Sequence, residues 1–451
     1  MKLATHEVIA EKVAEGMSDP LPRLMPRDLS LGEASLPARG NVVKLVAGVR
    51  RCGKTYRLYQ EMQALVSRGV PRSHLLYFNF DDERLLPYET AQLEELLAAY
   101  QKARPAARED GVYLFLDEIQ EVPGWGAFLR RVVDSWNATI YVTGSSSRML
   151  SSEMPSEFRG RALTYELFPY SLSEFCRAQG ACHSRDEAAS SDGKASLRNS
   201  LDAYLLRGGF PAADALARSE AFQLLQGYVS QTVSQDIVDR HGIKNHRAAR
   251  SFVSRCIAFS GRELSISKSQ AALRSAGVTV ARETLSDLLS YYEESYLVFQ
   301  NRELSRKLSD NTRSATKVYA VDPGLVAAFS PATARDLGQR LETAVFDALR
   351  RRAGFLRAGA ISRLLVDEGA KRHEVDFATG DILLDEPLEL VQVATDLDDS
   401  RTRKRELDAL TTAMERFGRS EATLVTLDDR EVVTLPQGTI RVVPAWDWLL
   451  D

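Results

Sequence analysis

Residues 48–55 read Gly48-Val49-Arg50-Arg51-Cys52-Gly53-Lys54-Thr55 and fit the pattern GxxxxGK[ST]. An apolar run at 42–47 precedes them and a helical pattern follows, which is the strand, loop and helix context of a phosphate-binding loop. Glycines let backbone N–H groups close around phosphates, a lysine neutralises them, and a Thr hydroxyl can coordinate Mg²⁺. We therefore expect an ATP site formed by Gly48, Arg50, Arg51, Cys52, Gly53, Lys54 and Thr55.

A pair of carboxylates supplies the second half of this site. The apolar run 112–116 ends in Asp117 and Glu118. A buried strand would place Asp117 beside the metal, so we assign Mg²⁺ to Thr55 and Asp117, and Glu118 could polarise the attacking water. The alternative is a strand end with two solvated acids.

Three further residues are candidates for catalysis. Ser145 follows the apolar run 139–143 and could orient water or sense the γ-phosphate, although a plain Gly/Ser turn would look the same. Arg159 and Arg161 precede the last apolar run, where a guanidinium could reach the nucleotide of a neighbouring subunit as an arginine finger. Both arginines could instead be ordinary surface residues.

The apolar runs alternate with helical patterns, which predicts an α/β fold with a mostly parallel sheet. These runs are residues 42–47, 75–80, 112–116, 139–143 and 162–167. With 451 residues the chain is too long for one core, so several domains are expected.

The composition is that of an ordinary soluble protein, with 44% hydrophobic and 27% charged residues. It contains no apolar stretch long enough to span a membrane, and its start lacks the apolar run of a signal peptide. The 4 cysteines form no CxxC pair, and the 6 histidines show no metal-ligand spacing. We expect a cytoplasmic protein with no membrane contact and no structural zinc.

Many short motifs along the chain resemble one known family, the prokaryotic AAA-like ATPases with a C-terminal domain formerly of unknown function. The motifs are GVRRCGKT, YFNFDDERL, LFLDEIQEVPGW, VTGSSSRML, the Arg159-Gly160-Arg161 segment running into LTYELFPYSLSEF, YLLRGGFP, DIVDRHGIKNHRAAR, KVYAVDPGL, LETAVFDAL, HEVDF and VVPAWDWLL. Their order holds over almost the whole chain, which makes them far more specific than the phosphate-binding loop alone.

The resemblance implies a P-loop NTPase core, a helical lid, a winged helix and a fold similar to restriction endonucleases. Arg207, in YLLRGGFP, falls where the lid begins and is a candidate nucleotide sensor, or a solvated arginine at a helix end. The expected parts are an N-terminal segment 1–40, the core 41–180, a linker 181–200, the lid 201–262, the winged helix 263–325 and the nuclease-like domain 335–451.

Basic residues concentrate in one part of this acidic chain, whose net charge is -4. Residues 239–275 hold eight Lys/Arg against two acids, and two helices joined at Gly277 could form a helix-turn-helix with a basic wing at 302–317. We expect Thr279 to cap the second helix. Such a module would contact DNA phosphates, or else bind protein. The candidate DNA contacts are Arg282, Arg302, Arg306, Lys307 and Arg313.

In the tail, Glu342, Asp376 and Gln392 fall where a restriction-like site would hold its acidic residues and its Glu/Gln-x-Lys strand. Two carboxylates could bind Mg²⁺. However, Ala394 stands at the lysine position and Gln392 is neutral, so we expect a nuclease-shaped domain that has lost its chemistry.

The sequence as a whole favours a homo-oligomeric ATPase, possibly a ring, that uses ATP and Mg²⁺ to work on DNA. A second interpretation is a signalling or scaffold switch that binds protein, and a third is an ATP-gated nuclease.

Overall fold

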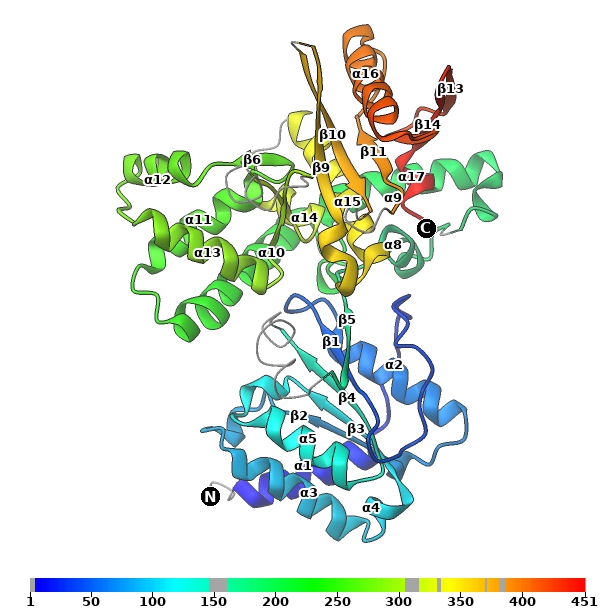
Figure 1. Cartoon of the computed structure of the whole chain (residues 1–451). Helices are drawn as coiled ribbons and strands as arrows, with labels where there is room; N and C mark the ends of the chain where they lie inside the picture. The colour runs from blue at the N-terminus through cyan, green and yellow to red at the C-terminus, as the bar shows by residue number, and fades with distance from the viewer. Residues whose placement is uncertain are drawn as a thin grey trace. The chain divides into compact units, whose positions relative to one another are not determined.

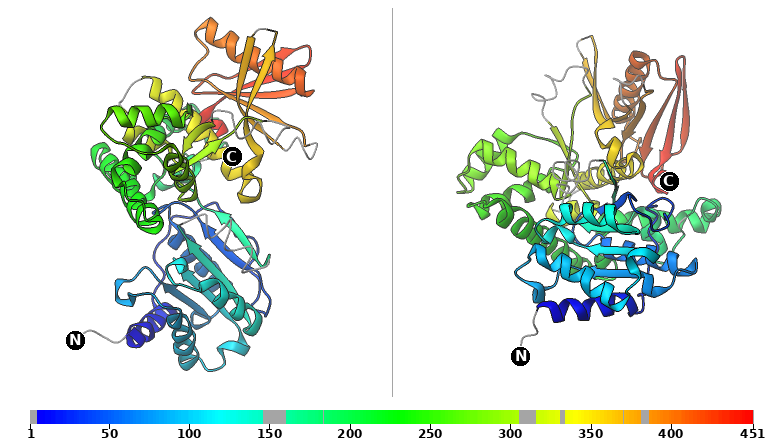
Figure 2. Two further views of the ribbon diagram at one scale, coloured as in Figure 1. Left: turned by 60° about the vertical axis from the view of Figure 1, so that its left-hand side comes forward. Right: turned by 60° about the horizontal axis from the view of Figure 1, so that its bottom comes forward.

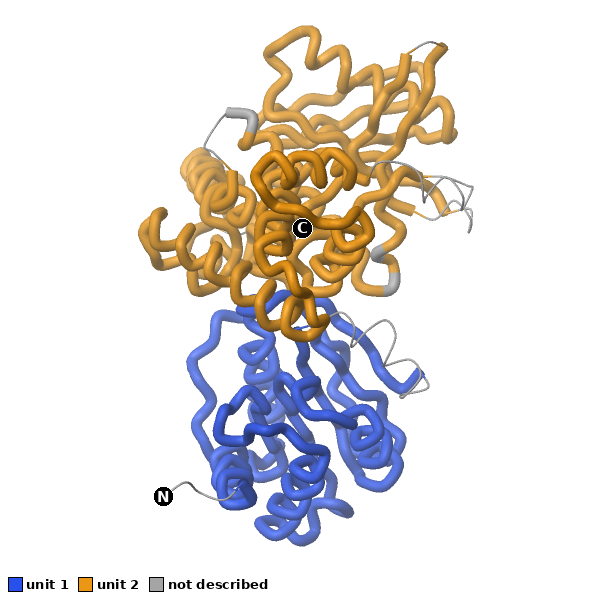
Figure 3. The backbone as a smooth tube through the Cα atoms, turned by 90° about the vertical axis from the view of Figure 1, so that its left-hand side faces the viewer, with its two compact units in different colours: residues 1–167 blue, residues 168–451 orange. Residues whose placement is uncertain are grey.

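The computed structural model describes residues 5–145, 160–182, 184–304, 316–330, 334–369, 371–380 and 386–450. The chain forms two compact units, Met1–Leu167 and Phe168–Asp451 (Figure 3). The first unit therefore ends before the expected boundary at residue 180. Among the described residues, no helix combines the length and apolar character that crossing a bilayer requires.

A five-stranded parallel sheet forms the centre of the first unit, as the apolar runs predicted. Its strands are β1 (Val43–Ala47), β2 (Leu75–Asn79), β3 (Val112–Asp117), β4 (Ala138–Gly144) and β5 (Ala162–Glu166), in the order β2-β3-β4-β1-β5. Strands β1, β3 and β4 are buried along their whole length, because their apolar side chains face helices on both sides.

Helices cover both faces of this sheet. They are α2 (Lys54–Ser67), α3 (Thr90–Ala103), the short α4 (Ala107–Asp110) and α5 (Trp125–Ser135). Figure 1 shows α3 and α5 on one side, as right-handed crossovers require when the chain moves out to β2 and then returns.

The N-terminal segment is part of the first unit rather than a separate tail. Helix α1 (Thr5–Ser18) packs against α3 and β2 and buries Val8, Ile9 and Val13. Gly16 lies so close to β2 that an added Cβ would stand 1.9 Å from the carbonyl oxygen of Tyr77.

The second unit begins with helices. They are α8 (Leu172–Ala178), α9 (Ser191–Arg207), α10 (Arg218–Thr232), the π-helix Val233–Asp239 and α11 (His246–Ala258). The expected linker at 181–200 is wrong for its second half, because α9 begins at Ser191. Ser190 caps this helix by accepting a 3.0 Å hydrogen bond from the Gly193 N–H, so its Ser-rich start is a cap and not a loop.

The two helices expected on either side of Gly277 are α12 (Ile266–Ser275) and α13 (Arg282–Glu294), and Gly277 lies between them at φ 76°. Thr279 does not cap α13, so that expectation is wrong: the N-cap residue is Ala281. Around these helices, β6 (Arg262–Leu264), β7 (Val298–Asn301) and β8 (Thr316–Ala320) form an antiparallel sheet in the order β6-β8-β7.

The rest of the unit builds a six-stranded mixed sheet in the order β13-β14-β12-β11-β10-β9, against which α16 packs (Figure 2). Its elements are α14 (Pro323–Phe329), α15 (Ala334–Ala353), β9 (Ile361–Glu368), β10 (Lys371–Thr379), β11 (Glu389–Val393), α16 (Ser400–Phe417), β12 (Glu421–Thr426), β13 (Glu431–Leu435), β14 (Gly438–Pro444) and α17 (Ala445–Trp448).

The two sheets of the second unit are joined by backbone and by side chains. The Leu304 N–H donates to the carbonyl of Arg363 in β9 at 2.8 Å, and the Arg363 N–H donates back to Arg302 at 2.9 Å. Tyr319 of β8 stacks on Phe346 of α15, with ring centroids 4.3 Å apart. The parts expected at 263–325 and 335–451 therefore share one core.

Candidate functional site

The loop between β1 and α2 has the shape that a phosphate site needs. A Cβ on Gly48 would lie 2.0 Å from the carbonyl oxygen of Leu167, so only glycine fits there. Arg51 at φ 68° and Gly53 at φ 104° turn the chain so that α2 begins at Lys54. The first N–H groups of α2 have no partner within the helix and can bind an anion.

Lys54 is held at the centre of this loop, with 4% of its surface exposed. Its Nζ lies 3.1 Å from the carbonyl of Gly48, 3.3 Å from that of Val49 and 3.4 Å from Oε1 of Glu118. Burial alone would lower the pKa of Lys54, but the nearby negative groups, of which Glu118 contributes most, together outweigh it and the pKa is raised. The side chain is therefore an ammonium that faces the carboxylate of Glu118.

Asp117 accepts hydrogen bonds from three hydroxyl groups. Thr55 donates at 2.6 Å and Tyr77 at 2.9 Å, and Thr143 donates to the other carboxylate oxygen. Burial, followed by the charge of Glu118, raises the pKa of Asp117. A carboxylate beside a Thr hydroxyl is a set of hard oxygen ligands that fits Mg²⁺.

Tyr77 and Thr143 are site residues that the sequence reasoning missed. Both stand in runs that were identified only as apolar strands, although Thr143 carries a hydroxyl near the carboxyl end of β4 and Tyr77 carries one in the middle of β2. Because the carboxyl ends of the strands meet at one edge of a parallel sheet, polar residues there are a usable signal.

Glu118 follows β3 in a left-handed conformation with φ 53°. Its N–H donates to the hydroxyl of Thr143 at 2.9 Å, and Gln120 donates to its Oε2 at 2.6 Å. Burial alone would raise the pKa of Glu118, but the charges of Lys54 and Arg50 and the hydrogen bond from Gln120 together outweigh it and the pKa is lowered. The carboxylate is therefore ionised, as a base must be.

Ser145 directly follows β4. It is 1% exposed, and its hydroxyl has no hydrogen-bond partner in the described part of the chain. A buried hydroxyl without a protein partner is free to meet water or a bound group.

The remaining loop residues have supporting contacts. The thiol of Cys52 donates to the carbonyl of Leu167 at 3.2 Å, and burial raises its pKa, so the thiol is a packing group. The charge of Arg50 acts on Glu118, whereas Arg51 is exposed. Arg27, which the sequence did not single out, donates to the carbonyl of Cys52 at 2.8 Å and braces the loop from the N-terminal segment.

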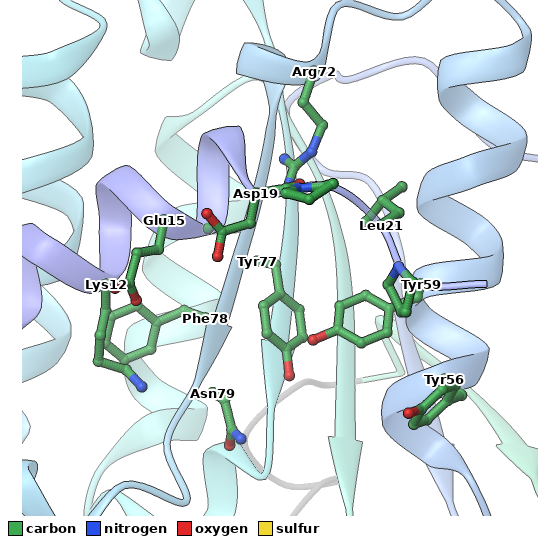
Figure 4. A pocket seen from close by; sticks show the side chains of 13 residues that line it. Lys12, Glu15, Asp19, Leu21, Tyr56, Tyr59, Arg72, Tyr77, Phe78 and Asn79 are labelled. Atoms are coloured by element: carbon green, nitrogen blue, oxygen red, sulfur yellow. The ribbon is translucent and has the colours of Figure 1, made fainter. Parts of the chain in front are cut away.

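A pocket of about 370 Å³ adjoins the Asp117 site and shares Tyr77 with it (Figure 4). The rings of Tyr59 and Tyr77 pack with centroids 4.8 Å apart in its wall. Lys12 and Arg72 also line it. Tyr77 thus connects this pocket to the carboxylate of Asp117 through one hydroxyl.

The arginine candidates lie in different parts of the chain. Arg161 forms a surface ion pair with Asp134, and Arg159 lies outside the described residues. Arg207 ends α9 in the second unit, where it donates to the carbonyl of Asp214 at 3.3 Å.

Of the candidate DNA contacts, Arg282 and Arg302 are exposed, and Arg306, Lys307 and Arg313 lie outside the described residues. Lys317, which the sequence placed in the basic wing, is not a surface charge. It is 7% exposed, and its Nζ lies 3.1 Å from both Glu342 and Asp376.

The acidic residues expected in the tail do come together. Glu342 of α15 and Asp376 of β10 share Lys317, and Gln392 of β11 accepts the N–H of Asp376 at 2.9 Å. Burial, followed by the charge of Asp376, raises the pKa of Glu342 to about 7. Ala394 packs against the apolar core of the sheet. A cation is therefore present, but it comes from β8 rather than from position 394.

Comparisons with known proteins identify two family domains and two relatives of this chain. A family model described as an AAA domain matches residues 40–176, and a domain of unknown function matches 198–336. The chain is 31% identical over 423 residues to the uncharacterized protein MJ1544 of Methanocaldococcus jannaschii, covering 91% of this chain and 88% of that one. An uncharacterized Haemophilus influenzae protein is 27% identical over 332 residues, 73% of this chain and 80% of its own.

Among solved structures, the Walker-type ATPase PABY2304 of Pyrococcus abyssi has a TM-score of 0.41 and 14% identity, over 72% of this chain and 95% of its own. The AAA match takes in all five strands of the first unit and every residue of the carboxylate and phosphate-loop cluster.

Proposed function

Because this chain belongs to the same protein family as MJ1544 and contains an AAA domain, we propose that it binds ATP with Mg²⁺ and hydrolyses it. One observation carries this proposal: Thr55 donates to Asp117 at 2.6 Å while Lys54 lies 3.4 Å from Glu118. A metal position and a base position are thus side by side under a phosphate-binding loop.

Each residue of the cluster has a distinct task in hydrolysis. Lys54 and the loop N–H groups bind the phosphates, and Thr55 and Asp117 would hold Mg²⁺, which neutralises charge developing on the phosphate oxygens. Glu118 polarises the attacking water, and the free hydroxyl of Ser145 orients it. The pairing of Lys54 with Glu118 keeps both groups charged until nucleotide arrives.

Two substitutions test this assignment. Lys54→Ala should abolish nucleotide binding, because its ammonium contacts phosphate in the ground state. Glu118→Gln should leave binding intact and lower kcat by at least about a hundredfold, because it acts on the water alone. Titration with a fluorescent ATP analogue and a phosphate-release assay measure the two effects. Glu109→Gln, an exposed position on α4, is the matched control. Normal turnover in Glu118→Gln would refute the choice of base.

We further propose that the second unit directs this ATPase to DNA. The order α11-β6-α12-α13-β7-β8 is that of a winged helix. On α11 and α12 the basic side chains Arg247, Arg250, Lys268 and Arg274 are exposed. Helix α13 has one basic residue, Arg282, and the acidic residues Glu283, Asp287, Glu293 and Glu294. Phosphate contact through α11 and α12 is therefore favoured over insertion of α13 into a groove.

Charge reversal at Lys268 and Arg274 tests this surface. The double Glu variant should bind duplex DNA more weakly and with a shallower salt dependence, by about one unit of slope for each phosphate that the protein no longer neutralises. The same change of charge at Lys404 and Arg416 on α16 is the control. Unchanged affinity in the first variant would instead favour the protein-binding scaffold, which the acidic α13 suits. Turnover measured with single-stranded, duplex and branched DNA would then identify the preferred structure.

A further inference from the structure

We propose that Lys317 fills, from within the protein, a cation site formed by Glu342, Glu374 and Asp376, and that this site accepts a divalent cation only when the lysine charge is removed. The ammonium lies 3.1 Å from Glu342 Oε1, 2.7 Å from Glu374 Oε1 and 3.1 Å from Asp376 Oδ1. Three carboxylates from α15 and β10 thus converge on one nitrogen. Carboxylate oxygens are also the ligands that a hard divalent ion prefers, with water completing its coordination.

The carboxylates are held in place by further hydrogen bonds. Tyr319 donates to Glu342 at 2.7 Å, and the Val393 N–H donates to Asp376 Oδ2 at 3.1 Å. Gln392 accepts the N–H of Asp376 and donates to Glu406 at 2.6 Å. Glu342 and Asp376 therefore keep their orientation independently of the ammonium, as the ligands of a built site do.

The lysine itself is fixed by its place in a sheet. Lys317 lies on β8, the middle strand, opposite Glu263 of β6 and Asn301 of β7. A shift of the Lys317 backbone would break the pairing of β8 with both β6 and β7, and this pairing holds the ammonium near the three carboxylates. In the described part of the chain no group of three His, Cys, Asp or Glu side chains is arranged to hold a metal ion as it stands. The three carboxylate oxygens lie 3.1, 2.7 and 3.1 Å from the lysine nitrogen, so they would have to move inward to reach the roughly 2.0 to 2.6 Å of a bond to a divalent ion.

Charge explains why a metal should enter once the lysine is replaced. One ammonium faces three buried or half-buried carboxylates, and without it their repulsion would have no compensation. A divalent ion supplies two positive charges at the same point. Lys317→Met keeps the length of the side chain and removes its charge, whereas Lys317→Arg keeps the charge.

The experiment is a Mn²⁺ titration of the nucleotide-free full chain, followed by the electron paramagnetic resonance signal of free Mn²⁺. Lys317→Met should bind one more Mn²⁺ than wild type, and should gain more thermal stability from Mn²⁺ than wild type does. Adding Asp376→Asn should abolish the extra site. Lys317→Arg and Lys268→Met should titrate like wild type.

Wild type offers a test that does not depend on folding of the Lys317 variant. Because the ammonium fills the site, Asp376→Asn alone should leave the Mn²⁺ titration unchanged. A wild-type site that disappears in Asp376→Asn would overturn the proposal and make the cluster a resident metal site with Lys317 beside it, as in a nuclease. A folded Lys317→Met variant without an extra Mn²⁺ would overturn it equally.

Discussion

Asp322, a residue of the second unit, joins two segments of the chain through hydrogen bonds to its carboxylate. It is buried, and its carboxylate accepts the Gly209 N–H at 2.6 Å and the Gly324 N–H at 2.8 Å. Burial raises the pKa of this carboxyl to about 6, although the two N–H groups oppose that change. The charges that act on it come from Arg351 and Asp347, both on α15.

The raised pKa predicts a specific pH dependence of stability. A carboxyl whose pKa is about 6 when folded and near 3.8 when unfolded binds its proton more tightly in the folded state. Its contribution is therefore fully present below about pH 4 and is lost as the pH rises through 6. Relative to Asp322→Asn, wild type should gain roughly 1 kcal/mol between pH 7.5 and pH 5 in urea unfolding. A constant difference between the two proteins would contradict this.

At the scale of residues, local sequence patterns predicted the site residues that lie within one motif. They missed contacts between residues that are far apart in the sequence. Lys54, Thr55 and the Asp117-Glu118 pair were found because strand and loop context fixes their place. Lys317 was misplaced because its partners Glu342 and Asp376 stand 25 and 59 residues away, beyond any local pattern.

At the scale of secondary-structure elements, the C-terminal end of α9 packs closely against the start of α14. A Cβ on Gly208, at φ 74°, would lie 1.8 Å from Oδ1 of Asp322, and a Cβ on Gly324 would lie 2.3 Å from the carbonyl oxygen of Arg207. These glycines belong to the YLLRGGFP and KVYAVDPGL motifs, so close approach of the two elements explains their small residues.

Gly208→Ala should therefore cost about 3 kcal/mol or more, because it combines a backbone conformation that favours glycine with a collision against a buried carboxylate. Gly277→Ala is the matched control: its φ is 76°, but nothing lies within 4 Å of its added Cβ. That change should cost only about 1 to 2 kcal/mol. Thermal unfolding of both variants provides the comparison, and equal losses would show that the contact with Asp322 contributes nothing.

The elements themselves were well predicted where hydrophobic periodicity was strong. All five strands of the first sheet, and α12 and α13, fall where the pattern put them. The N-terminal part of α9, residues 191–200, was mistaken for a linker because Ser and Asp favour both helix caps and loops. Helix α1 was missed because only three apolar residues fix its buried face.

On the scale of the whole molecule, the expected domain boundaries were the weakest part of the prediction. Sequence composition changes at a linker between domains. It shows no signal at contacts inside a shared core, such as the backbone hydrogen bonds between Leu304 and Arg363 or the ring stack of Tyr319 on Phe346. A core shared between distant segments leaves no mark on local composition, so the sequence predicts residues 263–325 and 335–451 as separate domains.

Assembly is the remaining prediction at this scale. If Arg161 acts on the nucleotide of a neighbouring subunit, Arg161→Ala should lower turnover at least tenfold, and mixing it with Glu118→Gln should restore part of the activity at mixed interfaces. Asp134→Asn is the control, because it removes the surface ion pair while keeping the arginine. An equal loss in Asp134→Asn, or an active species that sediments as a monomer, would contradict a role across subunits.

The bond between Gly209 and Asp322 also has a consequence for how the chain is made. Its two ends are separated by 113 residues. At about 5 to 20 residues per second, a ribosome needs roughly 6 to 20 s to deliver Asp322 after Gly209 has been added. During that time α9 has no α14 to pack against, although α14 is one of the helices that cover it in the finished protein. Part of the surface of α9 that is covered in the folded chain therefore stays open to water for seconds during synthesis.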